Sequence, residues 1–102
     1  MMIGRLLIVA AMMFWDGIGV AHAAGNVAAG KAKAVVCAGC HGAQGQGVGS
    51  YPSLNGLSEA QIVQNLKDFK SGKRDNAVMK GITAGLTDQD MANLAAYFAS
   101  LK

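Results

Sequence analysis

The stretch Cys37-Ala38-Gly39-Cys40-His41 brings together both cysteines of the chain and one of its two histidines. Thiols at this spacing can each form a thioether with one vinyl group on the edge of a haem, and the imidazole that follows can reach the iron. Cys-x-x-Cys-His is the attachment signature of c-type haem. The sequence therefore predicts one covalently bound haem c, with Cys37 and Cys40 as its anchors and His41 as an iron ligand.

Two other roles for these cysteines have to be weighed. A short-loop disulfide or a thioredoxin-type redox pair also uses Cys-x-x-Cys, but the redox pair belongs to a βαβ pattern that this sequence lacks. A zinc site needs four ligands, whereas the chain after residue 23 offers only two cysteines and one histidine. Haem attachment is favoured over both.

The segments around the motif have helical patterns, and none alternates like a strand. Residues 26–36 are rich in alanine, with Asn26 as a candidate N-cap, and they predict a helix of about ten residues that runs into Cys37. Residues 39–56 contain six glycines and the single proline of the chain, which predicts a loop.

Two capping patterns predict where the later helices begin. Ser58-Glu59-Ala60-Gln61 fits a capping box that opens a helix ending at Gly72, and Thr87-Asp88-Gln89-Asp90 opens the last helix in a similar way. Residues 73–86, between these helices, are expected to be irregular. The apolar face of the last helix consists of Met91, Leu94, Ala95, Phe98 and Leu101. The pattern predicts an all-α domain with three main helices.

Residues 1–23 have the pattern of a secretory signal peptide. Arg5 precedes an apolar run of ten residues, Leu6 to Trp15, and Ala21-His22-Ala23 is a small-x-small cleavage site. A retained anchor or a buried helix is the alternative, but a run of ten apolar residues is too short to span a bilayer. We expect export to the periplasm, one domain over residues 24–102, and no stable membrane insertion after cleavage.

The expected domain over residues 24–102 has a small supply of core side chains. It keeps four aromatic residues, and eight basic residues against five acidic ones. Burial alone stabilises a domain of this size only marginally, so a prosthetic group is expected to complete the core. The basic residues are scattered without interleaved aromatics, so nucleic-acid binding is not expected.

A second axial ligand for the iron has to come from another part of the chain. No histidine other than His41 follows residue 23, but Met79 and Met91 do. Met91 falls on the apolar face of the last helix, and a core position explains it. Met79 lies 38 residues after His41 in a glycine-flanked stretch, where it either crosses the far haem face in a loop or fills the core.

Taken together, these features resemble the bacterial class I cytochromes c, both the small monohaem carriers and single halves of the dihaem cytochromes. The resemblance covers residues 25–102. It rests on the haem motif, on Pro52-Ser53-Leu54 after the glycine-rich loop, on the methionine in the second loop and on the final Leu-Thr-Asp-x-Asp…Leu-Ala-Ala-Tyr-Phe pattern. It implies the class I cytochrome c fold, with helices wrapped around a covalently bound haem c.

The resemblance also implies roles for individual residues. His41 would be the proximal iron ligand and Met79 the distal one, and the Pro52 carbonyl would accept a hydrogen bond from the imidazole and so orient it. Gly30 and Tyr97 would mark a close crossing of the first and last helices. The sequence departs from the family at Ala34, where an aromatic residue is often found.

The function that follows is one-electron transfer in the periplasm, without catalysis. Histidine and methionine on the two faces of a haem leave no open position for a substrate. Two alternatives remain. The chain could be the haem c subunit of a larger redox enzyme, or, if Met79 does not reach the iron, a ligand-binding haem protein with an open sixth position.

The expected partners are redox proteins that donate and accept the electron. A run of basic residues could form their docking surface: Lys67, Lys70, Lys73, Arg74 and Lys80, partly offset by Asp68 and Asp75. Such a run can also be simply a solvated face. A carrier must dock and leave quickly, which suits a small interface steered by complementary charge.

Overall fold

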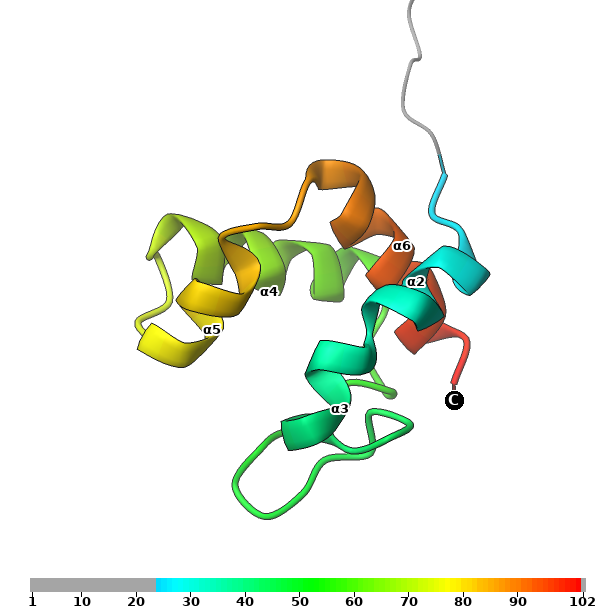
Figure 1. Cartoon of the computed structure of the whole chain (residues 1–102), viewed down its shortest axis with the longest axis horizontal. Helices are drawn as coiled ribbons and strands as arrows, with labels where there is room; N and C mark the ends of the chain where they lie inside the picture. Colours follow the sequence, from blue (N-terminus) through cyan, green and yellow to red (C-terminus); the bar gives the residue numbers. More distant parts are fainter. Residues whose placement is uncertain (1–23, 102) are drawn as a thin grey trace, which may run out of the picture.

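The computed structural model describes residues 24–101, which form five helices (Figure 1). They are α2 (Val27–Lys33), α3 (Val35–His41), α4 (Glu59–Ser71), α5 (Ala77–Thr83) and α6 (Asp88–Ala99). In this part of the chain the only extended pairing is one isolated bridge between Val48 and Tyr51. The all-α prediction is confirmed. The predicted signal peptide, residues 1–23, lies outside the described residues.

None of these five helices is long and apolar enough to cross a membrane. The three helices expected from the sequence correspond to α2 with α3, to α4 and to α6, while α5 was not expected.

Both predicted capping boxes are present. The Ser58 hydroxyl accepts a hydrogen bond from the Gln61 N–H at 3.2 Å, and the Gln61 side chain accepts one from the Ser58 N–H at 2.9 Å. Thr87 and Asp90 make the same reciprocal pair, with both bonds at 3.0 Å. Helix α4 ends at Gly72, which is left-handed with φ at 85°. The starts of α4 and α6 and the end of α4 are therefore confirmed.

Helix α2 crosses α6 at very close range. A Cβ at Gly30 would overlap the carbonyl oxygen of Asn93 and lie 2.8 Å from the Cβ of Tyr97. The side-chain oxygen of Asn93 in turn accepts a hydrogen bond of 2.8 Å from the N–H of Asn26. The absence of a side chain at residue 30 thus allows the two helix backbones to touch, and the crossing expected at Gly30 and Tyr97 is confirmed.

The hydrophobic core follows α6. Six consecutive or nearly consecutive residues of this helix are buried: Met91, Leu94, Ala95, Ala96, Tyr97 and Phe98. Ile62 of α4 packs against them, as does Ala34 between α2 and α3. Only 1% of Met91 is exposed, so its assignment to the core is confirmed.

The prediction of one helix over residues 26–36 and of a loop over residues 39–56 is wrong in two respects. The chain turns at Ala34, whose carbonyl accepts from the Cys37 N–H at 2.9 Å, and a new helix, α3, starts there. This helix continues through the haem motif to His41, so Gly39 and Cys40 are helical and the loop starts at Gly42. Because α2 is held against α6, the chain has to turn before α3 can leave that contact.

The irregular stretch predicted over residues 73–86 is also wrong, because it contains α5. The Asn76 side chain accepts from the Met79 N–H at 2.9 Å and so caps the start of this helix. Gly81 lies within the helix and weakens the sequence signal, since glycine is a poor helix former. Among the described helices, α5 packs against α4 alone.

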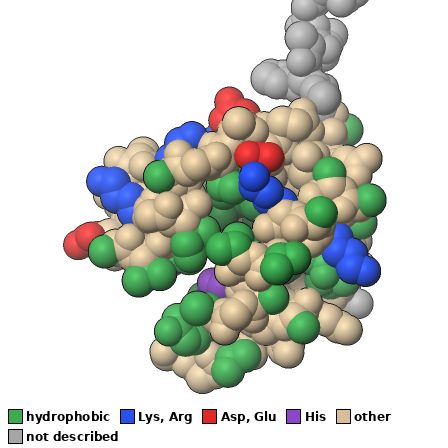
Figure 2. All heavy atoms as spheres, viewed as in Figure 1, with side chains coloured by type: hydrophobic (Ala, Val, Ile, Leu, Met, Phe, Trp, Pro, Cys, Tyr) green, Lys and Arg blue, Asp and Glu red, His purple; other side chains and the backbone are tan. Residues whose placement is uncertain are grey.

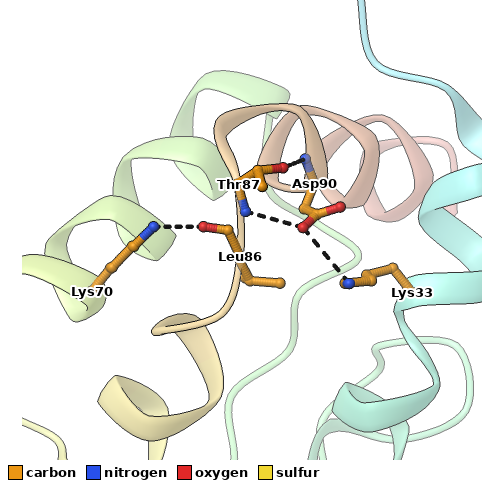
Figure 3. Close-up of polar contacts among 5 residues, drawn as sticks. All are labelled: Lys33, Lys70, Leu86, Thr87 and Asp90. Carbon is orange, nitrogen blue, oxygen red and sulfur yellow. Dashed lines mark hydrogen bonds and ion pairs between the residues drawn. The ribbon is translucent and has the colours of Figure 1, made fainter.

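Two side-chain contacts tie α4 and α2 to the start of α6 and to the loop before it (Figure 3). The Lys70 ammonium group donates to the Leu86 carbonyl at 2.6 Å, joining the end of α4 to this loop. On the other side, Lys33 of α2 lies 3.6 Å from the Asp90 carboxylate. The start of α6 is therefore connected to both of its neighbouring helices.

Candidate functional site

A cavity of about 720 Å³ lies between α3, the loop after it, α4, α5 and α6. It is the hollow in Figure 2, bordered by hydrophobic side chains and with the histidine of the described residues at its edge. Its volume is within the range of about 300–1,000 Å³ that is usual for cofactor sites. The residues predicted for the site all line it: Cys37, Cys40, His41, Pro52 and Met79.

His41 is buried and has a defined orientation. Its Nδ1 lies 2.8 Å from the carbonyl oxygen of Pro52, as the resemblance to cytochromes c implied. A carbonyl oxygen can only accept, so Nδ1 is the donor and Nε2 is the ring nitrogen left for another partner. The Tyr51 ring packs edge-on against the imidazole, with the ring centroids 6.1 Å apart. The arrangement orients the imidazole so that Nε2 is the nitrogen that could bind a metal.

The two thiols belong to the same helix as His41. Cys37 and Cys40 are half-buried free cysteines, and their spacing places them about one turn apart on one side of α3. Burial raises the pKa of the Cys37 thiol.

Met79 belongs to α5 and His41 to α3, and both side chains line the cavity. The structure places Met79 on a helix, not on the loop that the sequence predicted. Met91, the other methionine considered, is buried in the core and is not part of the cavity wall. Of the two methionines, only Met79 is in a position to offer its sulfur to a group in the cavity.

Sequence reasoning did not assign the end of α4 and the start of α5 to the site. Phe69, Arg74 and Asn76 all line the cavity there. The guanidinium of Arg74 lies over the Phe69 ring, 4.4 Å from its centroid. The signal for Asn76 was available, because an asparagine before Ala-Val-Met is a good N-cap. Nothing in the sequence pointed to the position of Arg74.

The donor atoms around the cavity fit a haem better than a free ion. Within residues 24–101, no group of three or more His, Cys, Asp or Glu side chains could hold a metal ion. The cavity instead offers one imidazole nitrogen, one thioether sulfur, two thiols and a mainly apolar wall. A porphyrin brings four nitrogen ligands of its own, so an iron in its centre needs only the two axial ligands that this set can supply.

An all-α fold with these groups around an apolar cavity is that of a class I cytochrome c. The family model described as cytochrome c matches residues 27–102, and the chain belongs to this family. Its members carry covalently bound haem c, and so does this chain.

Three relatives show where the similarity lies. Cytochrome c4 of Pseudomonas aeruginosa is 45% identical over 97 residues, which cover 94% of this chain and 48% of that protein. Cytochrome c-554(547) of Halothiobacillus neapolitanus is 45% identical over 91 residues, or 78% of this chain and 100% of that protein. The structure of reduced cytochrome c4 from Pseudomonas stutzeri superposes with a TM-score of 0.73 at 36% identity, covering 78% of this chain and 47% of the other.

The chain therefore spans about half the length of the cytochrome c4 relatives that it matches. It resembles one half of a dihaem cytochrome c4, and its similarity to the c-554 protein extends over the whole of that smaller protein.

Proposed function

We propose that the chain is a periplasmic carrier of single electrons and not an enzyme. In this proposal Cys37 and Cys40 anchor the haem as thioethers, and His41 and Met79 are its axial ligands. When bound, the haem supplies a site that accepts and releases one electron. The hydrogen bond from His41 to Pro52 is the observation that carries the proposal, because it leaves the Nε2 lone pair at a cavity shared with both thiols and Met79.

The residues around the cavity suit electron transfer better than catalysis. The Pro52 carbonyl fixes the His41 ring, and strong-field ligands on both faces leave no position for a substrate. Since His41 and Met79 would hold the iron in both oxidation states, little of the chain would have to move when the electron arrives. The cavity wall is mainly apolar, which favours the less charged ferrous form and so raises the potential.

A spectrum of the purified holoprotein and of its Met79→Ala variant tests this function. The oxidised wild-type protein is expected to show the weak red absorption band that reports an iron–sulfur bond. Met79→Ala should lose that band, lower the midpoint potential and bind carbon monoxide in the ferrous state. A wild-type protein that already binds carbon monoxide rapidly would instead be the ligand-binding haem protein considered above.

Export is part of the same proposal. We infer that residues 1–23 are removed and that residues 24–102 remain as the cytochrome domain, because covalent haem attachment is completed outside the cytoplasm. The intact mass of the holoprotein from a periplasmic fraction should equal residues 24–102 plus one haem. A haem-bearing product that keeps residues 1–23 would contradict the cleavage.

The partners are proposed to be redox proteins with an acidic docking patch. The basic side chains over α4, α5 and the segment between them support this (Figure 2), and Lys67 and Lys73 are exposed there. Lys70 is a poor member of this surface, because its ammonium group already bonds the Leu86 carbonyl. The name basic surface is used below for Lys67, Lys73, Arg74 and Lys80.

Charge-reversal variants distinguish an effect of the basic surface on association from an effect of the protein's net charge. Lys67→Glu and Lys73→Glu should each slow association with a redox partner, and the rate should fall steeply with salt, because exposed charges are screened beyond about 8 Å. Lys31→Glu on α2 changes the net charge equally and serves as the control. A rate that is indifferent to salt, or equally affected by all three variants, would contradict docking through the basic surface.

A further inference from the structure

Both polar backbone groups of Met79 are bonded by side chains of its own helical segment. The Met79 N–H donates to the side-chain oxygen of Asn76 at 2.9 Å. The Met79 carbonyl accepts from the hydroxyl of Thr83 at 2.8 Å, and the same hydroxyl lies 3.3 Å from the Lys80 carbonyl. The backbone of Met79 is thus held by Asn76, three residues before it, and by Thr83, four residues after it.

The Thr83 hydroxyl has no other evident role. Thr83 is 0% exposed and is not part of the cavity wall, so its hydroxyl contacts neither solvent nor a group in the cavity. A buried threonine within a helix commonly bonds the carbonyl four residues before it, which satisfies its hydroxyl. Here that carbonyl belongs to Met79.

Helix α5 needs such support more than the other helices do. It has seven residues, and isolated helices shorter than about 12–15 residues are marginal in water. Of the helices in residues 24–101 it packs against α4 alone, whereas α2, which is equally short, crosses the buried helix α6 (Figure 1). The geometry of α5 therefore depends strongly on the bonds that its own side chains make.

We propose that Asn76 and Thr83 are positioning residues for the sixth iron ligand. They fix the backbone of Met79 on both sides, and this keeps its side chain directed into the cavity and its sulfur on the iron. The inference rests on the proposed function, in which Met79 is that ligand. Removing the hydrogen bond of Asn76 or that of Thr83 leaves the Met79 sulfur on the iron. It is then displaced more easily, by hydroxide in the ferric protein and by carbon monoxide in the ferrous protein.

Thr83→Val tests the hydroxyl, because valine keeps the shape of the side chain and removes the donor. Losing one hydrogen bond should raise the population without methionine on the iron about tenfold. The pH at which the oxidised holoprotein loses its red band should then fall by about one unit, because hydroxide would take the place of the sulfur and its concentration changes tenfold per pH unit. Thr83→Ser keeps the hydroxyl and should restore the wild-type midpoint.

Asn76→Ala tests the other bond and remains informative if Thr83→Val does not fold. Its matched control is Asn26→Ala, since Asn26 caps the seven-residue helix α2 by accepting from the Ala29 N–H at 2.8 Å. Thr87→Val, at the cap of α6, is the control for Thr83. Both controls should lower the thermal stability without moving the midpoint of band loss or the rate of carbon monoxide binding.

The experiment distinguishes a failure of the proposed function from a failure of the positioning proposal. If the red band survives in Met79→Ala, the ligand assignment of the proposed function is wrong. If Met79→Ala loses the band but Asn76→Ala and Thr83→Val shift the midpoint no more than their controls do, Met79 is the ligand and the positioning proposal alone is wrong.

Discussion

The crossing of α2 and α6 and the wall formed by α5 are held together in different ways. At the crossing, backbone touches backbone at Gly30, and one side of α6 is almost completely buried. Within the described residues, helix α5 packs against no helix but α4, and its Met79 and Ile82 line a cavity of about 720 Å³. The protein therefore completes its own packing at the crossing, but not at the cavity.

The crossing of α2 and α6 and the region around the cavity therefore contribute differently to the domain. The crossing supplies stability that does not depend on the cofactor, because every atom in contact there is protein. The cavity half, which comprises α3, the loop after it and α5, holds the residues that we propose as haem ligands, and a haem in the cavity would supply the packing that this half lacks. Substitutions in the two halves should therefore have effects of different kinds.

The largest effect is expected when haem attachment is lost. A variant with both Cys37→Ser and Cys40→Ser should contain almost no covalent haem and should lose the structure of α3 and α5, because the cavity then collapses or fills with water. Covalent haem content and amide hydrogen exchange measure both effects. Protection in α6 should persist longer than in α5. A double variant as well ordered as the holoprotein would show that the cavity half is stable by itself.

The next largest effect is expected when a methionine is replaced, and the two methionines lie in different halves. Met91→Ala should lower the free energy of unfolding by about 2–5 kcal/mol, because it leaves a new void at a side chain that is only 1% exposed and is not part of the cavity wall. It should keep the red band and the potential of the wild-type protein. Met79→Ala should do the reverse, losing the band at a smaller cost in stability. If Met91→Ala removes the band, the ligand assignment passes to Met91.

A smaller contrast is expected between two helical glycines. Gly30→Ala should destabilise the protein by about 1–3 kcal/mol, because the new Cβ would overlap the Asn93 carbonyl and force the helices apart. Gly81→Ala, in α5, meets no atom within 4 Å and should stabilise the protein by up to about 1 kcal/mol. Urea unfolding of the two holoproteins measures both values. Equal effects would mean that the crossing is less tightly packed than its geometry indicates.

The sequence predicted the crossing half better than the cavity half, for a physical reason. Capping boxes and the apolar face of α6 are local patterns, so the bounds of α4 and α6 could be predicted closely. The turn at Ala34 depends on the contact of α2 with α6, which no local pattern encodes. For α5 a local N-cap signal at Asn76 was present, but Gly81 within the helix weakened the pattern. For the site, the spacing of Cys37, Cys40 and His41 carries the chemistry, but the helical placement of Met79 could not be predicted from a glycine-flanked stretch.

The smallest effect concerns the charge of Asp90 at the edge of the crossing. Its bond to the backbone of Thr87 lowers the pKa of this carboxyl most strongly, and the nearby Lys33 ammonium lowers it further. A lowered pKa stabilises the folded state above the unfolded value of about 3.9, and this contribution is lost as the pH falls through the folded value. Asp90→Asn removes the charge but keeps an oxygen that can cap Thr87.

The variant Asp90→Asn should therefore lower the melting temperature at pH 7 by no more than about 4 °C, because exposed ion pairs contribute little. The difference from the wild-type protein should shrink as the pH falls below about 4 and vanish once both states are protonated. Asp88→Asn lies in the same first turn of α6 and shares its interaction with the helix dipole, but lacks the Lys33 and Thr87 contacts. If both variants show the same pH dependence, the helix dipole alone accounts for the effect and the link between α2 and α6 contributes nothing measurable.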